Sequence, residues 1–338
     1  MKAFDELTTE DLDAWHTLRA ANPALDSPYF HPGFAAAVHE FQPVRVAVSR
    51  DPDGKVVSLL ACHRDGALLR PVGWPGADFQ GPVRAPGTAF RPLDLLGRGI
   101  RGLAFDHLLE AEGFEPWIVS RRPSPYVDVT GGLDGYLGRA TRTGKDNLGQ
   151  ARRRTAKAER TLGPIRFAAD TVDGLEHVIR LKRAQYAATG AKDYFAEPGR
   201  AELLTKLLHT RGPDFAGVLS TLHAGPHLLA AHFGMRAGGV LHWWFPVYDP
   251  AHAALAPGWI LLRELMAAAP ALGVHRIDLG RGDDEYKRRA KTGESVVCQG
   301  LVTRNPARLA ARRARDSLAA TARRSTFLRD LARKIRNL

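Results

Sequence analysis

The ten residues from Asp278 to Lys287, DLGRGDDEYK, concentrate side chains that carry charge or move protons. Asp283 and Lys287 are four residues apart, so on a helix they would share one face, with Tyr286 beside Lys287 and Arg281 just before. Carboxyl, phenol and amine groups in such a cluster suit general acid–base chemistry. The same residues also allow a surface salt bridge between Asp283 and Lys287, with Tyr286 packed against the body of the protein.

Two more candidates for proton transfer stand earlier in the chain. His232 lies in a predicted strand between the small residues Ala230 and Gly234, which leave room for a ligand, so it is a candidate base or substrate contact. A buried core histidine explains the same pattern equally well. Asp249 follows a predicted strand and is either a catalytic carboxylate or the turn residue before Pro250.

Aromatic and polar residues suggest binding surfaces. Asp78 and Gln80 occupy a loop dense in Gly, Pro and aromatic residues, where they could bind sugar hydroxyls. Trp243 and Trp244 are adjacent in one predicted strand, so they point to opposite faces and at most one of them lines a cleft. Core packing is the alternative for both tryptophans.

The elements that position these residues follow from hydrophobic periodicity and from turn residues. We expect helices at about 9–20, 146–162, 172–188, 200–210, 258–272 and 284–290. We expect strands at 43–49, 56–63, 68–72, 126–130, 165–169, 215–222, 227–235, 240–248, 275–279 and 296–303. The Pro-rich segment 121–125 predicts a boundary between domains 1–122 and 123–303, with a basic helical tail at 304–338.

The order of elements in the second half is that of the GNAT acyltransferase core. Three antiparallel strands are followed by a Gly-started helix, a strand, a helix and a last strand. Its segments resemble the CelD/BcsL-like acetyltransferase family, which is related to the FemABX peptidyltransferases. The resemblance covers about residues 25–303 and rests on LAAHFG (229–234), HWWF (242–245), YDP (248–250), APG (256–258), DLGRGDDEYK (278–287), ADFQGP (77–82) and SPY (124–126).

This resemblance implies an α/β (α+β) fold of tandem GNAT-like domains, each a mixed, largely antiparallel sheet flanked by helices. It implies an enzyme that transfers acetyl or another acyl group from acyl-CoA to an amine or hydroxyl of a sugar, polysaccharide precursor or specialised metabolite. The acceptor would lie between the halves and the donor in the second half. No Cys/His spacing suits a metal, and none is expected.

The resemblance also implies roles for particular residues. The helix that begins at Pro257-Gly258 would hold the CoA pyrophosphate on its free N–H groups and dipole. Tyr286 stands where many GNAT enzymes place their acid. The predicted sets are catalytic His232, Asp249, Asp283, Tyr286 and Lys287; cofactor-binding Trp243, Pro257, Gly258, Trp259 and Arg281; and substrate-binding Asp78, Gln80, Tyr248 and Asp278.

Two other functions stay open at this point. The loop 254–259 differs from the usual GNAT pattern Arg/Gln-x-x-Gly-x-Gly/Ala, so aminoacyl-tRNA, which FemABX-like proteins can use, is an alternative donor. A non-catalytic scaffold that associates with a membrane during polysaccharide production is the third reading.

The net charge of +12 is unevenly distributed along the 338 residues. Residues 304–338 carry +9 and residues 139–166 carry +7, which leaves −4 for the rest. The basic helix near 146–162 shows no wide apolar stripe, so it is either a solvated helix or a contact for CoA phosphates, tRNA or another anionic polymer.

The tail has a helical apolar stripe, formed by Phe327, Leu328, Leu331, Ile335 and Leu338. With its basic residues it resembles an interfacial helix on anionic lipid; a helix docked on the domain and a disordered tail are the alternatives. No apolar run is long enough to span a bilayer and the N-terminus turns acidic at once, so we expect a cytoplasmic protein, with peripheral contact at the inner membrane face through this tail.

Overall fold

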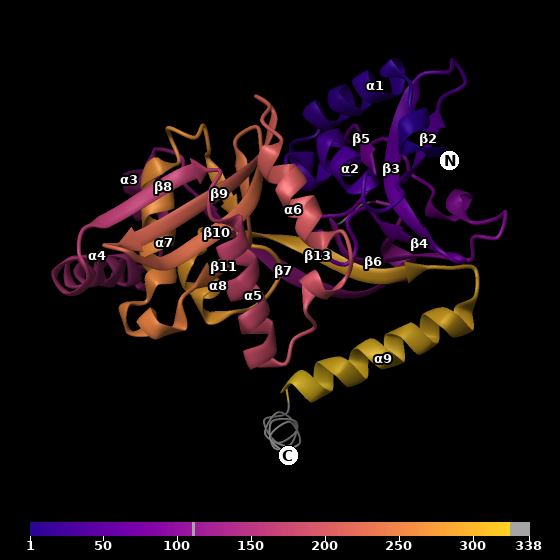
Figure 1. The fold of residues 1–338 in the computed structure, drawn as a ribbon. Helices are drawn as coiled ribbons and strands as arrows, with labels where there is room; N and C mark the ends of the chain where they lie inside the picture. Colours follow the sequence, from indigo (N-terminus) through magenta and orange to yellow (C-terminus); the bar gives the residue numbers. More distant parts are fainter. Residues whose placement is uncertain (110–111, 325–338) are drawn as a thin grey trace.

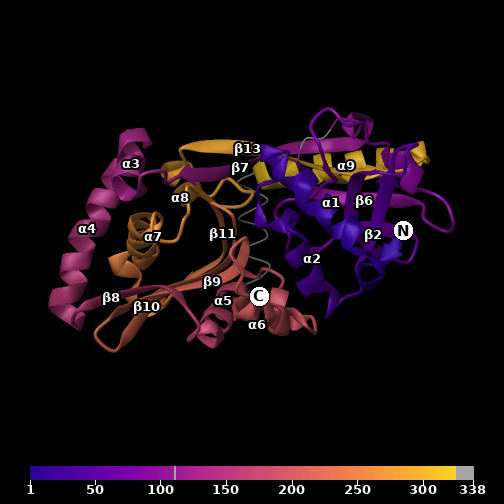
Figure 2. The same cartoon turned by 90° about the horizontal axis from the view of Figure 1, so that it is seen from above.

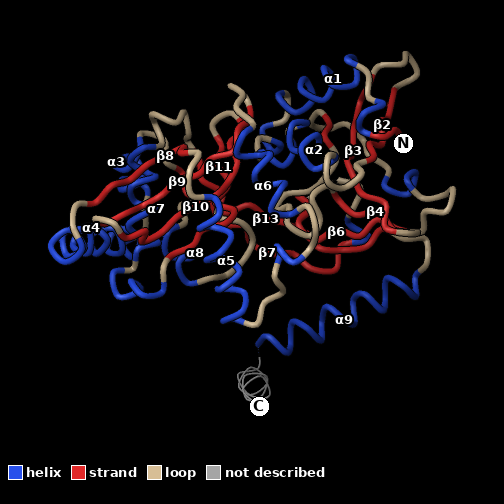
Figure 3. The backbone as a smooth tube through the Cα atoms, in the orientation of Figure 1, coloured by secondary structure: helices blue, strands red, loops and turns tan. Residues whose placement is uncertain are grey.

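The computed structural model describes residues 1–109 and 112–324. Within them, 13 strands form one mixed sheet in the order β1-β2-β3-β4-β6-β13-β7-β12-β11-β10-β9-β8, with β5 paired to β3 (Figures 1 and 3). The strands are β1 (Lys2–Ala3), β2 (Arg45–Arg50), β3 (Val56–Asp65), β4 (Leu68–Pro71), β5 (Val83–Arg84), β6 (Gly102–Leu109), β7 (Ile118–Asp128), β8 (Ile165–Thr171), β9 (Phe215–Ala224), β10 (His227–Ala237), β11 (Val240–Tyr248), β12 (Arg276–Asp278) and β13 (Gly293–Val302).

The helices cover both faces of the sheet. They are α1 (Thr9–Ala20), α2 (Pro32–His39), α3 (Gly132–Arg139), α4 (Arg142–Leu162), α5 (Leu175–Thr189), α6 (Arg200–His209), α7 (Pro257–Ala268), α8 (Glu285–Ala290) and α9 (Pro306–Arg324). In the second half, α7 packs on one face of β8–β11, while α5 and α6 lie on the other (Figure 2). The predicted α/β fold is therefore confirmed. The elements expected in the second half fall within a few residues of their predicted bounds, except that the strand expected at 126–130 is the end of β7, which begins at Ile118.

The predicted strand order of the second half is also confirmed. β9, β10 and β11 are antiparallel neighbours, and β11 then pairs with β12 in parallel. A parallel neighbour needs a crossover connection, and α7 supplies it. This places the N-terminus of α7 beside the end of β11.

The segment 121–125 lies inside a strand and not in a linker. β7 runs from Ile118 to Asp128 and pairs with β13 along most of its length, and β13 then returns to pair with β6 of the first half. Pro123 and Pro125, which have no backbone N–H, are compatible with this strand because β12 pairs only with residues 126–128 of β7. The nitrogens of the two prolines therefore need not donate a hydrogen bond to a neighbouring strand. Their carbonyls accept from the N–H groups of Gly282 and Leu279.

A shared core joins the two halves. The largest apolar cluster contains Trp15 and Phe34 from the first half and Leu204 and Phe245 from the second. A second cluster lies within the second half, and a third joins the first half to Cys298 and Val302 of β13. The halves therefore pack directly against each other, so side chains from both can meet at fixed distances.

The basic helix α4 does have a packing stripe, contrary to the sequence prediction. Its buried face is made of small or mid-sized residues, Gly144, Leu148, Ala151 and Ala158 among them, and it packs on α7. Glycine and alanine do not register as an apolar stripe, although they allow close helix–helix approach. The basic side chains Arg142, Lys145, Arg152, Arg153, Lys157 and Arg160 are exposed.

The helix α9 runs beneath the sheet, where it contacts β7 and β13 (Figure 1). Asp316 holds it there by accepting from Gln299 of β13 and Arg312 of α9. The predicted apolar stripe from Phe327 to Leu338 lies outside the described residues. Among the helices that are described, none is both long and apolar enough to cross a bilayer.

Candidate active site

The end of β11 separates from its neighbour and leaves a cavity. β12 pairs with β11 only as far as His242 and ends at Asp278, after which the chain turns toward β7. β11 continues to Tyr248 without a partner on that side. The opening holds a cavity of about 340 Å³, lined by Gln185, Trp243, Pro246, Val247, Tyr248, Ala253, Ala256, Pro257, Gly258, Trp259, Leu261, Leu262 and Tyr286.

The N-terminus of α7 forms one wall of this cavity. A short 3-10 helix, Pro250–Leu255, precedes α7, and Ala256 takes a left-handed conformation with φ 47°. Pro257 fits the first helical position because it has no N–H to leave unbonded. At Gly258, apart from its chain neighbours and the backbone of its own helix, no atom of the described residues lies within 4 Å of the position that a Cβ would take, and its φ is not positive. Neither packing nor backbone conformation requires a glycine there.

Trp243 and Tyr286 form the opposite wall. Trp243 is 4% exposed and stacks on His232, with ring centroids 4.3 Å apart and planes 11° apart. Trp244 instead packs against Tyr29 and donates to the carbonyl of Gly76, so only one of the two tryptophans lines the cavity, as predicted. Burial raises the pKa of Tyr286, and Asp284 and Asp78 raise it further, so its phenol stays protonated.

His232 lies behind the cavity wall and has no open space around it. It is fully buried, and its Nε2 lies 3.2 Å from the carbonyl oxygen of His242. The expected room at Gly234 is filled, because a Cβ there would overlap that carbonyl oxygen and the ring of His232. Burial lowers the pKa of His232 to about 3, so the ring is neutral and acts on the cavity through Trp243.

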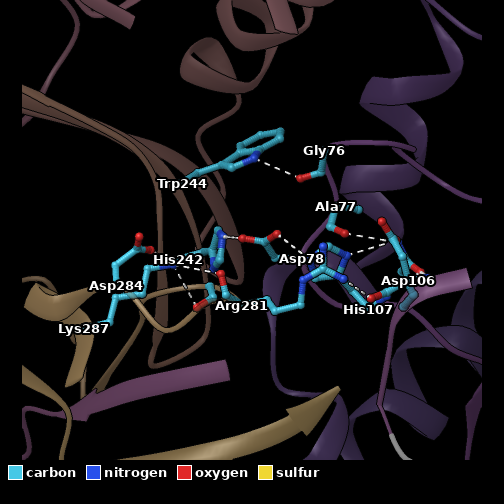
Figure 4. A network of polar contacts seen from close by, with 12 residues as sticks. Gly76, Ala77, Asp78, Asp106, His107, His242, Trp244, Arg281, Asp284 and Lys287 are labelled. Carbon is cyan, nitrogen blue, oxygen red and sulfur yellow. Dashed lines mark hydrogen bonds and ion pairs between the residues drawn. The ribbon is translucent and has the colours of Figure 1, made fainter. Parts of the chain in front are cut away.

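A polar network links the two halves next to the cavity (Figure 4). Asp78, from the loop after β4, accepts from His242 Nε2 at 3.0 Å and lies 3.2 Å from Nε2 of His107 on β6. Burial alone would raise the pKa of Asp78. The hydrogen bond from His242 and the charges of His107 and Lys287 outweigh burial and hold that pKa well below its usual value. Asp78 is therefore ionised, and its side chain remains 26% exposed.

Lys287 is buried and binds its own loop. Its Nζ donates to the carbonyls of Gly280 and Arg281 at 3.1 and 3.0 Å and lies 3.5 Å from Asp284. The predicted pair of Asp283 with Lys287 does not form, because α8 begins only at Glu285 and Asp283 lies before it. Asp283 is exposed and pairs with Arg288 instead.

Four other predicted residues are used within the protein and do not line the cavity. Arg281 donates to the carbonyl of Asp106 across the interface. The Gln80 amide donates to Ala77 and Asp106 and accepts from two backbone N–H groups. Asp249 caps the 3-10 helix by accepting from Ala251. Asp278 is buried and pairs with Arg276, which also binds Asp26 of the first half through two hydrogen bonds of 2.6 Å.

Sequence reasoning missed several residues at the site. His107 and His242 both contact Asp78. Gln185 of α5 lines the cavity, and Lys182 of the same helix contacts the carbonyl of Pro246, another lining residue. These residues come from elements separate from the DLGRGDDEYK segment, so no local sequence pattern linked them to the site. A lysine two helical turns into an otherwise amphipathic helix is predicted to be a surface residue.

In the described part of the chain, no cluster of three or more His, Cys, Asp or Glu side chains is arranged to hold a metal ion.

Comparison with known proteins agrees with this architecture. Residues 145–288 match a family described as an acetyltransferase (GNAT) domain. The solved structure of FemX aligns with a TM-score of 0.58 at 11% identity, over 88% of this chain and 95% of FemX. The structure of L-PGS from Bacillus licheniformis aligns with a TM-score of 0.52 at 12% identity, over 91% of this chain and 96% of L-PGS. No curated protein sequence matches the chain.

These structural similarities extend over both halves of the chain. At such low sequence identity they support the fold alone. The match to residues 145–288 covers β8–β12 with α5–α7, and thus every element that surrounds the cavity except the end of α8. The chain therefore carries a GNAT-type acyltransferase domain and is an enzyme of the acyltransferase class.

Proposed function

We propose that this enzyme moves an acyl group, acetyl in the simplest case, from acyl-CoA to an amine or hydroxyl acceptor. The observation that carries the proposal is the open space at Gly258 beside the cavity. At a cavity wall such a glycine lets a ligand lie close to the backbone. The N-terminal N–H groups of α7 favour an anion there, and the CoA pyrophosphate is such an anion.

The rest of the cavity suits a thioester. Trp243, Trp259 and Tyr286 supply apolar walls, and the partnerless edge of β11 presents backbone groups to the acyl carbonyl. The buried phenol of Tyr286 holds its proton at neutral pH and can give it to the departing thiolate. His232 supports Trp243 from behind in this scheme.

The acceptor would be a sugar, a polysaccharide precursor or a specialised metabolite, as the resemblance to the CelD/BcsL-like family suggests. The partly exposed, ionised Asp78 supports an acceptor with hydroxyl or ammonium groups, because a carboxylate takes hydrogen bonds from both. Tyr248, which is 45% exposed at the cavity rim, is a second surface for it.

Calorimetry with acetyl-CoA tests the donor. Gly258→Val should fold normally, since the space is open, and should weaken acetyl-CoA binding at least about tenfold, or ~1.4 kcal/mol. Gly149→Val on α4 is the matched control, because its Cβ position is also open. Unchanged affinity in Gly258→Val, or no binding by the wild type, contradicts the proposal.

A second donor is supported by the exposed basic face of α4. Six Arg and Lys side chains there would suit an RNA backbone, so aminoacyl-tRNA is the alternative donor. This alternative is supported if tRNA binds with an affinity that falls steeply as the salt concentration rises. Binding should also be lost when Arg152, Arg153 and Lys157 are changed to Glu. Binding of neither donor would favour a non-catalytic scaffold.

A membrane contact is proposed for the basic segment 304–338. On α9, Arg308 and Arg315 are exposed and available to anionic headgroups. Sedimentation with phosphatidylglycerol vesicles should fall when residues 304–338 are deleted, while circular dichroism shows an intact fold. Equal sedimentation of the full and the truncated chain contradicts the contact.

A further inference from the structure

Lys182 of α5 is a half-buried amine that has no role in the transfer proposed above. Its Nζ donates only a long bond, 3.4 Å, to the carbonyl of Pro246, and it lies 5.6 Å from the ring of Tyr186. Among the described residues no carboxylate forms an ion pair with it. An ammonium group that is taken from water without a counter-ion is unfavourable, so this position raises the fraction of the amine that is neutral.

Lys182 lies beside the cavity. Pro246, whose carbonyl it contacts, and Gln185, one turn further along α5, both line the cavity. Gly258, which also lines the cavity, belongs to α7, which packs on the opposite face of the sheet from α5. A donor held on α7 would therefore have Lys182 on the side from which an acceptor must approach.

The charges around Lys182 act in the same direction. Lys287 faces it from α8, Asp284 faces it from the preceding loop, and Tyr186 lies on its own helix. Lys287 is fixed by two backbone carbonyls, so it cannot turn away. Burial lowers the pKa of Lys182 to about 8; repulsion from Lys287 contributes to this, and Asp284 opposes it only in part. Paired lysines are a known way to activate one amine.

We propose that the Lys182 amine accepts the proton from an ammonium acceptor, and that the acceptor is therefore an amine. This inference rests on the proposed acyl-CoA-dependent transfer. The acceptor R–NH3⁺ gives one proton to Nζ and becomes R–NH2. Its lone pair attacks the thioester carbon, so that a C–N bond forms and the C–S bond breaks with its electron pair on sulfur. A second proton passes from nitrogen to sulfur, relayed by the Tyr286 hydroxyl, and Lys182 releases its proton to water.

Competitive labelling with acetic anhydride, followed by mass spectrometry of the full chain over pH 6–11, tests the proton acceptor directly. The labelling midpoint of Lys182 should fall near pH 8. Lys192, which is 79% exposed and paired with Glu197, is the internal control for access of the reagent. Bound acetyl-CoA should slow the labelling of Lys182 severalfold and leave that of Lys192 unchanged.

The outcomes separate the inference from the proposed function. A Lys182 midpoint near pH 10.5, the ordinary value for a lysine, overturns the inference, because the neutral amine would then be as scarce at neutral pH as it is in the unfolded chain. Binding of acetyl-CoA by calorimetry without protection of Lys182 also overturns it, while the transfer function stands. If acetyl-CoA does not bind at all, the proposed function fails and the inference fails with it. Stoichiometric acetylation of Lys182 by acetyl-CoA alone would make it a nucleophile and not a proton acceptor.

Discussion

Asp78 and His242, which are 164 positions apart, form the hydrogen bond that ties the loop of the first half to the strand beside the cavity of the second. The Asp78 carboxylate accepts from Nε2 at 3.0 Å, and the ring of Tyr29 meets that of His242 edge-on at 4.9 Å. The bond fixes the strand at the point where β11 leaves β12. The geometry of the cavity therefore depends on contacts made by both halves.

Asp78→Ala should lower the free energy of unfolding by about 1–3 kcal/mol, because the buried His242 ring loses its acceptor. Urea unfolding at pH 7 measures it. Asp65→Ala, which removes an exposed pair with Arg70, is the control and should change stability by less than about 0.5 kcal/mol. Equal effects of the two substitutions would contradict a structural role for the Asp78 bond.

The pH dependence of the same variant gives a second test. The pKa of Asp78 lies below its value in the unfolded chain, so the unfolded state binds its proton more readily. The stabilisation is therefore complete above about pH 4 and is lost as the pH falls further. Unfolding between pH 6 and pH 2 should show a shallower loss of stability in Asp78→Ala than in the wild type.

Gly280→Ala should destabilise the protein more than Gly238→Ala. Both glycines have positive φ, 74° and 53°, which costs an alanine about 1–2 kcal/mol. Only at Gly280 would the new Cβ overlap the Asp78 carboxylate, whereas the position at Gly238 is open. Thermal unfolding measures the difference. In an Asp78→Ala background the two substitutions should destabilise the protein equally. If Gly280→Ala is still the more destabilising of the two, the new Cβ overlaps a group other than the Asp78 carboxylate.

Lys182→Met should stabilise the protein at pH 7 and lose that advantage at high pH. The pKa of Lys182 is about 8 in the folded chain and higher in the unfolded chain, where it takes the ordinary value near 10.5. The burial penalty is thus fully present below pH 8 and fades between about 8 and 10.5. Melting temperatures at pH 7 and pH 10 test this. A constant difference across that range would mean that Lys182 is charged throughout.

Tyr286→Phe should slow the release of CoA thiol from acetyl-CoA by about 100-fold, because the ring is kept and the proton donor is lost. The dissociation constant of acetyl-CoA should stay within about twofold of the wild type. Tyr126→Phe, at a tyrosine that does not line the cavity, is the control and should retain its rate. A loss of rate that is matched by a loss of affinity would indicate a packing role for the Tyr286 hydroxyl.

Local sequence patterns were sufficient to predict most of the helices and strands in the second half. Alternating apolar residues and the turns Ala224-Gly225-Pro226 and Ala237-Gly238-Gly239 predicted β9, β10 and β11, because each pattern is read within about ten residues. The Pro257-Gly258 pair predicted the start of α7 and one wall of the cavity. At 121–125, in contrast, two prolines suggested a linker, and only the missing neighbour on one side of β7 explains a strand there.

The sequence by itself determined the elements, the GNAT-like order of the second half, and Trp243, Pro257, Gly258, Trp259 and Tyr286 as cavity residues. Each of these follows from short-range pattern or from a resemblance in contiguous segments. Only the tertiary structure decided that Asp78 meets His242 and His107, that Lys287 binds its own loop, and that no carboxylate of the described residues pairs with Lys182. Those contacts join separate elements, and burial and pairing, which set the charge of each group, exist only once the elements have packed.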